Sequence, residues 1–220
     1  MNNNQYFGEF LTTLPNKVEL NSSELGTAVM LFGLAVSTNA VDILEIGRWK
    51  GLSTFAFSSA LRYLDIPRTV PECHKQRKDI DYSFTMFPPK RKLVSVDPYP
   101  QPEAYETIKT NELNNYVEFI DKRSDTYDTD KSFDIIFIDG DHTYNGCSAD
   151  VRQYILSTPK YLKDGGYFII HDYFGWFEGD GENKSPIKKV CDELVALNVF
   201  EHILIDIKFM SFVIFRKKNK

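Results

Sequence analysis

The chain has 220 residues, of which 42% are hydrophobic and 17 are phenylalanine, enough to bury the core of one domain but short for two. Its formal net charge of −5 gives no overall basic field that would favour a nucleic-acid partner. Three widely spaced cysteines form no disulfide framework, the first residues lack a signal-peptide pattern, and no apolar run is long enough to span a bilayer. We therefore predict one cytoplasmic domain covering residues 1–220, with no membrane partner.

The first third of the chain contains a strand, a glycine-bearing turn and a helix, in that order. Residues 1–40 form an N-terminal helical segment in which Ser22 and Glu24 are placed to cap a helix. Residues 41–46 are an apolar strand that ends at Gly47, and residues 52–64 show the spacing of an amphipathic helix. Residues 66–90 interrupt this rhythm with four prolines and many charges. They are an inserted surface segment, either a flap or a disordered loop.

Regular structure resumes after the insertion. Strands are predicted over 92–96, 116–120, 133–139 and 167–170, helices over 103–113, 145–156 and 186–197, and a turn over 164–166. Residues 203–207 and 209–215 are apolar and separated by a single lysine, which predicts an antiparallel hairpin. This alternation predicts an α/β fold with a doubly wound, mainly parallel seven-stranded sheet that ends in the hairpin. Basic residues before the second strand, among them Arg91, are interpreted as solvated surface.

Acidic residues follow almost every predicted strand. Ligands of open parallel sheets sit beyond the carboxyl ends of the strands, so these acids mark the candidate site. The first strand ends in Glu-x-Gly-x-x-x-Gly, from Glu45 to Gly51, and not in the glycine-rich loop that cradles a pyrophosphate. An acid and fewer glycines favour a positively charged ligand without phosphates. Asp97, after the next strand, is placed to accept hydrogen bonds from two ribose hydroxyls, so the pattern predicts a nucleoside site.

Two longer motifs carry a family resemblance. Residues 133–144 read Phe-Asp-Ile-Ile-Phe-Ile-Asp-Gly-Asp-His-Thr-Tyr, Asp150 follows, and residues 162–173 read Leu-Lys-Asp-Gly-Gly-Tyr-Phe-Ile-Ile-His-Asp-Tyr. With the earlier strand ends, these motifs resemble the class I S-adenosylmethionine-dependent methyltransferases. Within that superfamily they resemble small-molecule O-methyltransferases related to macrolide-sugar, aminocoumarin-sugar and cephalosporin-pathway enzymes. The resemblance runs from about Ser22 to the C-terminus, apart from the insertion, and implies a Rossmann-like fold.

The resemblance implies which residues bind S-adenosylmethionine. The loop after the first strand would shape the methionine side of the cofactor, Asp97 would hold the ribose, and the residues after the third strand would border the adenine. The insertion lies between Gly47 and Asp97, so the ribose assignment depends on residues 92–96 being the second strand. The cofactor-binding residues predicted in this way are Glu45, Gly47, Arg48, Gly51, Ser53, Asp97, Ser124, Asp125 and Asp139.

The related sugar enzymes bind a divalent cation through the acid after the fourth strand and an acidic pair after the fifth. The corresponding residues here are Asp139, His171 and Asp172, so one carboxylate is replaced by an imidazole. Mg²⁺ prefers oxygen ligands and imidazole suits softer metals. The pattern leaves open Mg²⁺, another divalent metal such as Mn²⁺ or Fe²⁺, or no metal.

Methyl transfer to a hydroxyl needs a group that removes the proton. Asp141 and His142 are the candidate catalytic bases, since Asp141 matches the base of the sugar enzymes and histidine has a suitable ordinary pKa. The alternative for His142 is a loop residue that stacks on the adenine or packs beneath the next helix.

The sequence therefore predicts an S-adenosylmethionine-dependent O-methyltransferase acting on a small hydroxylated molecule, such as a sugar or another polar metabolite. Three alternatives stay open: a nucleic-acid methyltransferase, a protein like the antibiotic-pathway hydroxylases of the superfamily, and a non-catalytic cofactor-binding scaffold. A homo-oligomer is also open, because the apolar residues between Tyr6 and Leu14 could serve a dimer interface or cover the sheet.

Overall fold

The computed structural model describes residues 22–66, 90–99, 101–157, 160–174, 185–207 and 210–217. Three predicted parts lie wholly or partly outside the described residues. They are the N-terminal segment before Ser22, almost all of the insertion, and part of the loop after the fifth strand. The strands are β1 (Asp42–Ile46), β2 (Lys92–Val96), β3 (Val117–Ile120), β4 (Phe133–Ile138), β5 (Leu162–His171), β6 (Phe200–Ile207) and β7 (Met210–Lys217). The α-helices are α2 (Ser22–Ser37), α3 (Leu52–Asp65), α4 (Pro102–Thr110), α5 (Tyr144–Val151) and α6 (Pro186–Ala196).

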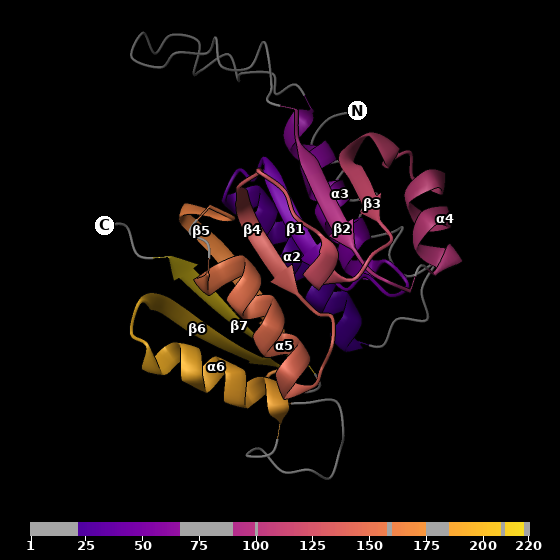
Figure 1. Cartoon of the computed structure of the whole chain (residues 1–220). Coiled ribbons are helices and arrows are strands. Elements are labelled where there is room, and N and C mark those ends of the chain that lie inside the picture. Colours follow the sequence, from indigo (N-terminus) through magenta and orange to yellow (C-terminus); the bar gives the residue numbers. More distant parts are fainter. Residues whose placement is uncertain are drawn as a thin grey trace, which may run out of the picture.

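The seven strands form one sheet in the order β3-β2-β1-β4-β5-β7-β6. The first five are parallel, and β7 pairs antiparallel with both β5 and β6. Helices α2 and α3 cover one face and α5 and α6 the other (Figure 1). The predicted doubly wound sheet with a terminal hairpin is confirmed. None of the described helices is long and apolar enough to cross a membrane.

The two-sided core explains why the parallel strands are mostly apolar and do not alternate between apolar and polar residues. Successive side chains of a strand point to opposite faces, and both faces are covered by helices. In β1, Ile43 packs on the side of α2 and α3, while Leu44 and Ile46 pack on the side of α5 and α6. Glu45 points to the same side as Ile43 and is the one acid buried within this strand.

Two predicted elements differ from the structure. The predicted helix 145–156 consists of α5 followed by a wider π-helical turn, Arg152–Leu156. The spacing of apolar residues in the sequence does not distinguish such a turn from an α-helix. The predicted turn at 164–166 lies inside β5, which already begins at Leu162. Between the pairs Phe133–Leu162 and Ile135–Tyr167 the strand carries extra residues, and Gly165 adopts a φ of 73° there. The turn signal in the sequence therefore marks a bulge in a continuous strand.

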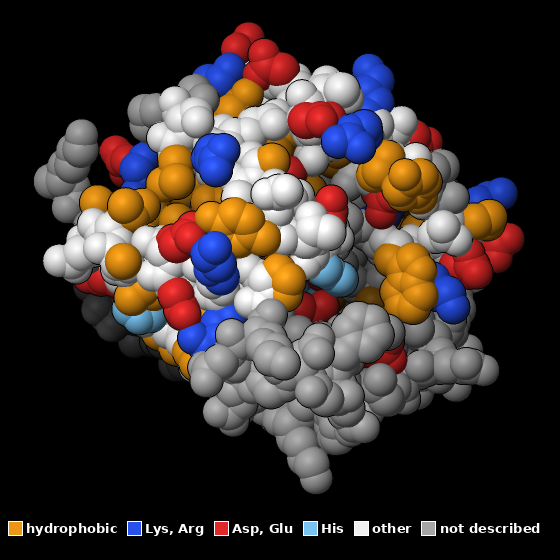
Figure 2. All heavy atoms as spheres, turned by 60° about the horizontal axis from the view of Figure 1, so that its bottom comes forward, with side chains coloured by type: hydrophobic (Ala, Val, Ile, Leu, Met, Phe, Trp, Pro, Cys, Tyr) orange, Lys and Arg blue, Asp and Glu red, His pale blue; other side chains and the backbone are white. Residues whose placement is uncertain are grey.

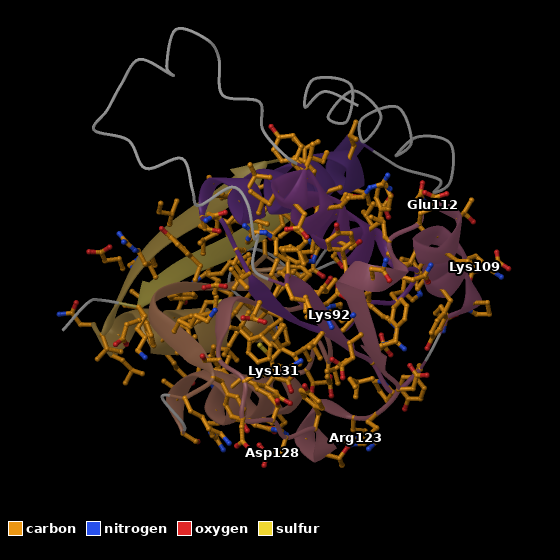
Figure 3. The ribbon with its side chains drawn as sticks, turned by 90° about the horizontal axis from the view of Figure 1, so that it is seen from above. Lys92, Lys109, Glu112, Arg123, Asp128 and Lys131 are labelled. Carbon is orange, nitrogen blue, oxygen red and sulfur yellow. The ribbon has the colours of Figure 1, made fainter. Side chains whose placement is uncertain are left out.

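The basic residues before β2 are not all solvated surface, which corrects one interpretation. Arg91 is buried, donates to Asp65 at 2.9 Å and to the side chain of Asn39 at 2.9 Å, and so ties the end of α3 to the end of α2. Lys92 and Lys131 lie at the amino edge of the sheet, where Lys131 pairs with Glu118 at 3.3 Å (Figure 3). This edge is opposite the one that carries the acids after the strands.

Candidate active site

The predicted site residues meet at the carboxyl edge of the parallel strands. Figure 2 turns this edge toward the reader and shows histidine and acidic side chains close together near its centre. The predicted residues come from the ends of β1, β2, β3, β4 and β5 and the loops that follow them, which are far apart in the sequence. The parallel register brings these loops together, because all five strands end at the same edge.

Two glycines shape the loop after β1. Gly47 has a φ of 85°, and a Cβ built on it would lie 2.0 Å from the carbonyl oxygen of Asp139. Gly51 has a φ of 87° at the N-cap of α3, and its Cβ would lie 2.8 Å from Ala104. Both positions need a left-handed backbone and a close approach, which glycine alone provides at no steric cost. The loop is thereby fixed against the start of the loop that carries Asp139.

Asp97 organises the loops after β1 and β2. Its carboxylate accepts hydrogen bonds from the backbone N–H groups of Arg48 at 2.9 Å, Trp49 at 3.1 Å and Tyr99 at 2.7 Å. Each carboxylate oxygen has two lone pairs; Oδ2 already accepts two of these hydrogen bonds and Oδ1 one, so one acceptor position, on Oδ1, is left for a ribose hydroxyl. Trp49 and Tyr99, whose backbone N–H groups bind this carboxylate, carry exposed aromatic side chains.

Arg48 connects the loop after β1 to β2 through its buried side chain. Its guanidinium is buried, donates to the carbonyl oxygen of Ser95 at 3.0 Å and to the hydroxyl of Tyr105 at 2.9 Å, and forms an ion pair with Asp121. These partners hold the guanidinium within the protein. Arg48 therefore supports the loop after β1 and, through its backbone N–H, Asp97; its predicted contact with a cofactor stays a prediction.

Glu45 is enclosed by hydroxyl groups. Ser53 and Ser95 donate to its carboxylate at 2.5 Å and Thr54 donates at 2.7 Å. These hydroxyls lower the pKa of Glu45, but burial has the larger effect and raises this pKa to about 7. The carboxylate ties the first turn of α3 to β1 and β2. Sequence reasoning identified Glu45 and Ser53 but missed Thr54 and Ser95, which resemble ordinary small polar residues of a helix and a strand.

The residues predicted to border the adenine have different surroundings. Ser124 donates to the carboxylate of the buried Asp150 on α5 at 2.5 Å, and its carbonyl oxygen accepts from Tyr154 at 2.6 Å. Asp125 is exposed and pairs with Arg123 at 2.9 Å. The segment after β3 is therefore anchored to α5 through Ser124, while Asp125 lies at the surface with Arg123 as its partner.

The buried Asp150 predicts a pH-dependent stability. Burial raises the pKa of Asp150 to about 6, above the 3.8 of an unperturbed aspartate. The folded state therefore favours the protonated form, and stability is lost as the pH rises from about 4 through 6. Asp150→Asn keeps the acceptor for Ser124 and removes the charge. We expect it to raise the free energy of unfolding by about 1–3 kcal/mol at pH 8.

Urea unfolding at pH 8 and at pH 4 measures this effect. Most of the gain should vanish at pH 4, where Asp150 is protonated in the folded state and, with its ordinary pKa of 3.8, only partly ionised in the unfolded state. An Asp150→Asn variant that is less stable than wild type at pH 8 would contradict the argument.

The centre of the site is a cluster of two carboxylates and two imidazoles. Asp139 lies 3.2 Å from Nε2 of His142 and 3.2 Å from Nδ1 of His171. Asp172, whose φ is 57°, lies 3.4 Å from His142 and 3.2 Å from His171. Burial alone would raise the pKa of Asp139, but the two imidazoles lower it to about 2. Burial lowers the pKa of His171, but the two carboxylates raise it to about 10.

Three of these side chains could hold a metal ion. One ligand atom each from Asp139, His142 and Asp172 lies within 4.8 Å of the others. The prediction named Asp139, His171 and Asp172, and the structure brings His142 to the same place. His171 faces both carboxylates through Nδ1, and its buried Nε2 has no partner among the described residues. Two carboxylates with an imidazole fit a divalent transition metal better than they fit Mg²⁺.

The remaining candidate base, Asp141, lies at the start of α5. It is exposed, and its carboxylate accepts from the backbone N–H of Thr143 at 2.8 Å. Each of the two motifs ends in a tyrosine. Tyr144 donates to Glu193 at 2.9 Å and Tyr173 donates to Asp192 at 3.0 Å, so both loops are fastened to α6.

Comparisons with known proteins agree with this geometry. Residues 44–173, more than half of the chain, match the family described as "Methyltransferase domain". The fold is similar to a Podospora anserina methyltransferase, PaMTH1, solved with SAH (TM-score 0.63, 16% identity, 97% of this chain and 88% of that one). It is also similar to the O-methyltransferase TomG from Streptomyces achromogenes, solved with SAM (TM-score 0.62, 15% identity, 96% and 90%). A third similar structure is an O-methyltransferase from Bacillus cereus in complex with SAH (TM-score 0.60, 16% identity, 98% and 90%). No curated protein sequence matches the chain.

The matched span begins in β1 and ends just after β5, so it contains every loop that contributes to the cluster and to the Asp97 site. The resemblance inferred from the motifs is thus confirmed at the level of family and fold, and the chain belongs to the methyltransferase domain family.

Proposed function

We propose that this methyltransferase transfers the methyl group of S-adenosylmethionine to a hydroxyl oxygen of a small polar molecule, such as a sugar. The observation that carries the proposal is the placement of Asp139, His142 and Asp172 beside the Gly47 loop, at the edge where Asp97 binds the backbone of the loop after β1. The similar structures solved with SAM or SAH support this cofactor. The net charge of −5 favours a small acceptor over a nucleic acid.

The reaction is a displacement at the sulfonium methyl carbon. The acceptor oxygen forms a bond to this carbon, the carbon–sulfur bond breaks, and its electron pair leaves with S-adenosylhomocysteine (SAH). The cofactor supplies the activated methyl group, and the protein aligns the two reactants. The acceptor proton must go to a base, and the candidates in the loop after β4 are His142 and Asp141.

A divalent cation fits the same cluster. Asp139, His142 and Asp172 would hold it, with His171 supporting both carboxylates from the buried side. A bound cation would lower the pKa of a coordinated hydroxyl and so make the acceptor a better nucleophile. Without it, Asp139 and Asp172 orient His142 as the base. The site supports proton removal in either case.

Calorimetric titration with SAH tests the cofactor, first in EDTA and then with Mn²⁺ or Mg²⁺. We expect SAH to bind in both conditions and Mn²⁺ alone to bind with a measurable heat. An acceptor screen with isotopically labelled S-adenosylmethionine would then identify the substrate class. Failure of SAH to bind under any condition would contradict the proposed function. Binding without turnover of any acceptor would favour a cofactor-binding scaffold.

Asp97→Ala is expected to weaken SAH binding by at least about tenfold, since each lost hydrogen bond to a charged group contributes about 1.5–3 kcal/mol. Because Asp97 accepts from three backbone N–H groups, the variant should also lower the melting temperature. Calorimetry and thermal denaturation measure the two effects. Asp125→Ala, an exposed acid in the loop after β3, is the control expected to leave the melting temperature unchanged. Normal SAH affinity in Asp97→Ala would show that β2 does not provide the ribose ligand.

A further inference from the structure

The surface around β6 exposes more apolar side chains than any other described region. In the described part of the chain, eight large hydrophobic residues are exposed, and five of them fall within residues 195–204. They run from the end of α6 to the middle of β6, and they are Val195, Leu197, Val199, Ile203 and Leu204. Ile203 and Leu204 are successive residues of β6 and point to opposite faces of the sheet, so apolar side chains are exposed on both faces of this edge strand. A cluster of this kind marks an interaction site more often than single exposed residues do.

The strand itself is also open to pairing. β6 is the last strand of the sheet, and no described strand pairs with its outer edge (Figure 1). Edge strands are normally protected by charged side chains, above all lysine, or by proline, a bulge or short length. β6 has eight residues, contains neither lysine nor proline, carries its two acids near its ends at positions 201 and 206, and pairs with β7 without interruption from Phe200 to Ile207. Its free backbone N–H and C=O groups therefore form a regular template for another strand.

We propose that β6 pairs antiparallel with β6 of a second copy of this chain, which joins the two sheets into one across a two-fold axis. An axis perpendicular to the sheet keeps each side chain on its own face, so paired positions must differ by an even number. When the axis passes through position 204, position 202 (His) lies opposite position 206 (Asp), and position 203 lies opposite 205, both isoleucine. This register pairs a hydrogen-bond donor with an acceptor and apolar with apolar residues.

The neighbouring registers are worse. With the axis at position 203, Phe200 would lie opposite Asp206, and with the axis at 205, Leu204 would lie opposite Asp206.

A stable dimer buries at least about 1,200 Å² in total, more than one pair of strands provides. The exposed residues at the end of α6 extend the apolar surface beside the strand. The interface would lie at the far end of the sheet from β1, so it leaves the cofactor site open, and it does not depend on the proposed function.

Leu204→Glu tests the proposal, because it places two glutamates directly opposite each other on the axis, where like charges destabilise strand pairing. Leu156→Glu is a matched control, since Leu204 and Leu156 are each 43% exposed and Leu156 lies in the turn after α5. By sedimentation velocity we expect the wild type and Leu156→Glu at twice the chain mass of 25.4 kDa, and Leu204→Glu at the mass of one chain. Circular dichroism establishes that all three are folded.

A mixture of variants tests the register. Leu204→Lys alone should also be a monomer, while an equimolar mixture of Leu204→Glu and Leu204→Lys should recover the dimer, because opposite charges now meet on the axis. A monomeric wild type, a dimer that survives Leu204→Glu, or a mixture that stays monomeric would overturn the proposal. In a monomeric wild type, slow hydrogen exchange of the β6 amides would show that another segment of the same chain covers the strand.

Discussion

Replacing Asp139 with asparagine is expected to lower the rate of methyl transfer by about 10²–10⁴-fold, the usual contribution of a proton-transfer group. Asp139 is the residue through which both imidazoles of the cluster are held, at 3.2 Å from each. Asparagine keeps the shape but removes the charge, so the pKa values of His142 and His171 fall and one candidate metal ligand is lost. The backbone carbonyl of Asp139, which faces Gly47, is unchanged, so SAH affinity should stay within a few-fold of wild type.

Rates with saturating labelled S-adenosylmethionine and calorimetric titrations with SAH and with Mn²⁺ measure the three effects. Asp164→Asn makes the same chemical change on a strongly exposed side chain of β5, ion-paired with Lys217, and should leave all three values unchanged. Asp141→Asn separates the two candidate bases. If it abolishes turnover while Asp139→Asn does not, Asp141 is the base and the imidazole cluster serves another purpose.

The fold was predictable because its decisive features are local in the sequence. Strands buried on both faces read as short apolar runs, and β4, from Phe133 to Ile138, is the clearest of them. The bulge in β5 was not predictable in the same way. Gly165 signals a positive φ, but a turn between elements and a bulge within a strand use the same residue types. Only the pairing with β4 decides between them, and pairing is a tertiary property.

The site was predictable in its residue types and less so in its contacts. The motif residues Asp139, His142, His171 and Asp172 were all named from the sequence, because they lie at or shortly after the ends of two recognisable strands, β4 and β5. Which imidazole shares a ligand set with the two carboxylates depends on how the loop after β4 turns back, and the sequence does not contain that distance. The hydroxyls around Glu45 show the same limit, since Ser95 lies 50 positions away and meets Glu45 only through the β1–β2 register.

Gly47→Ala, in the loop after β1, is the second substitution for which we expect a large effect, a strong destabilisation of the native structure. A φ of 85° costs an L-residue about 1–2 kcal/mol, and the added Cβ would lie 2.0 Å from the carbonyl oxygen of Asp139. Backbone on both sides must move to relieve this contact, since neither group is the end of a flexible side chain. We expect the free energy of unfolding to fall by at least about 3 kcal/mol, and SAH binding to be lost with it, because the contact joins the cofactor loop to the cluster.

Gly33→Ala is the matched control, because Gly33 lies on the exposed side of α2 and a Cβ there meets nothing within 4 Å. In a helix interior this change should stabilise the protein by about 1 kcal/mol, so the same substitution has opposite signs at the two glycines. Gly47→Asn separates the two causes, since asparagine tolerates a positive φ but still carries a Cβ. If Gly47→Asn is as stable as wild type in urea, backbone conformation and not the approach to Asp139 requires the glycine. If it unfolds as easily as Gly47→Ala, the two loops are packed as closely as the structure shows, and the cofactor site and the imidazole cluster form one rigid unit.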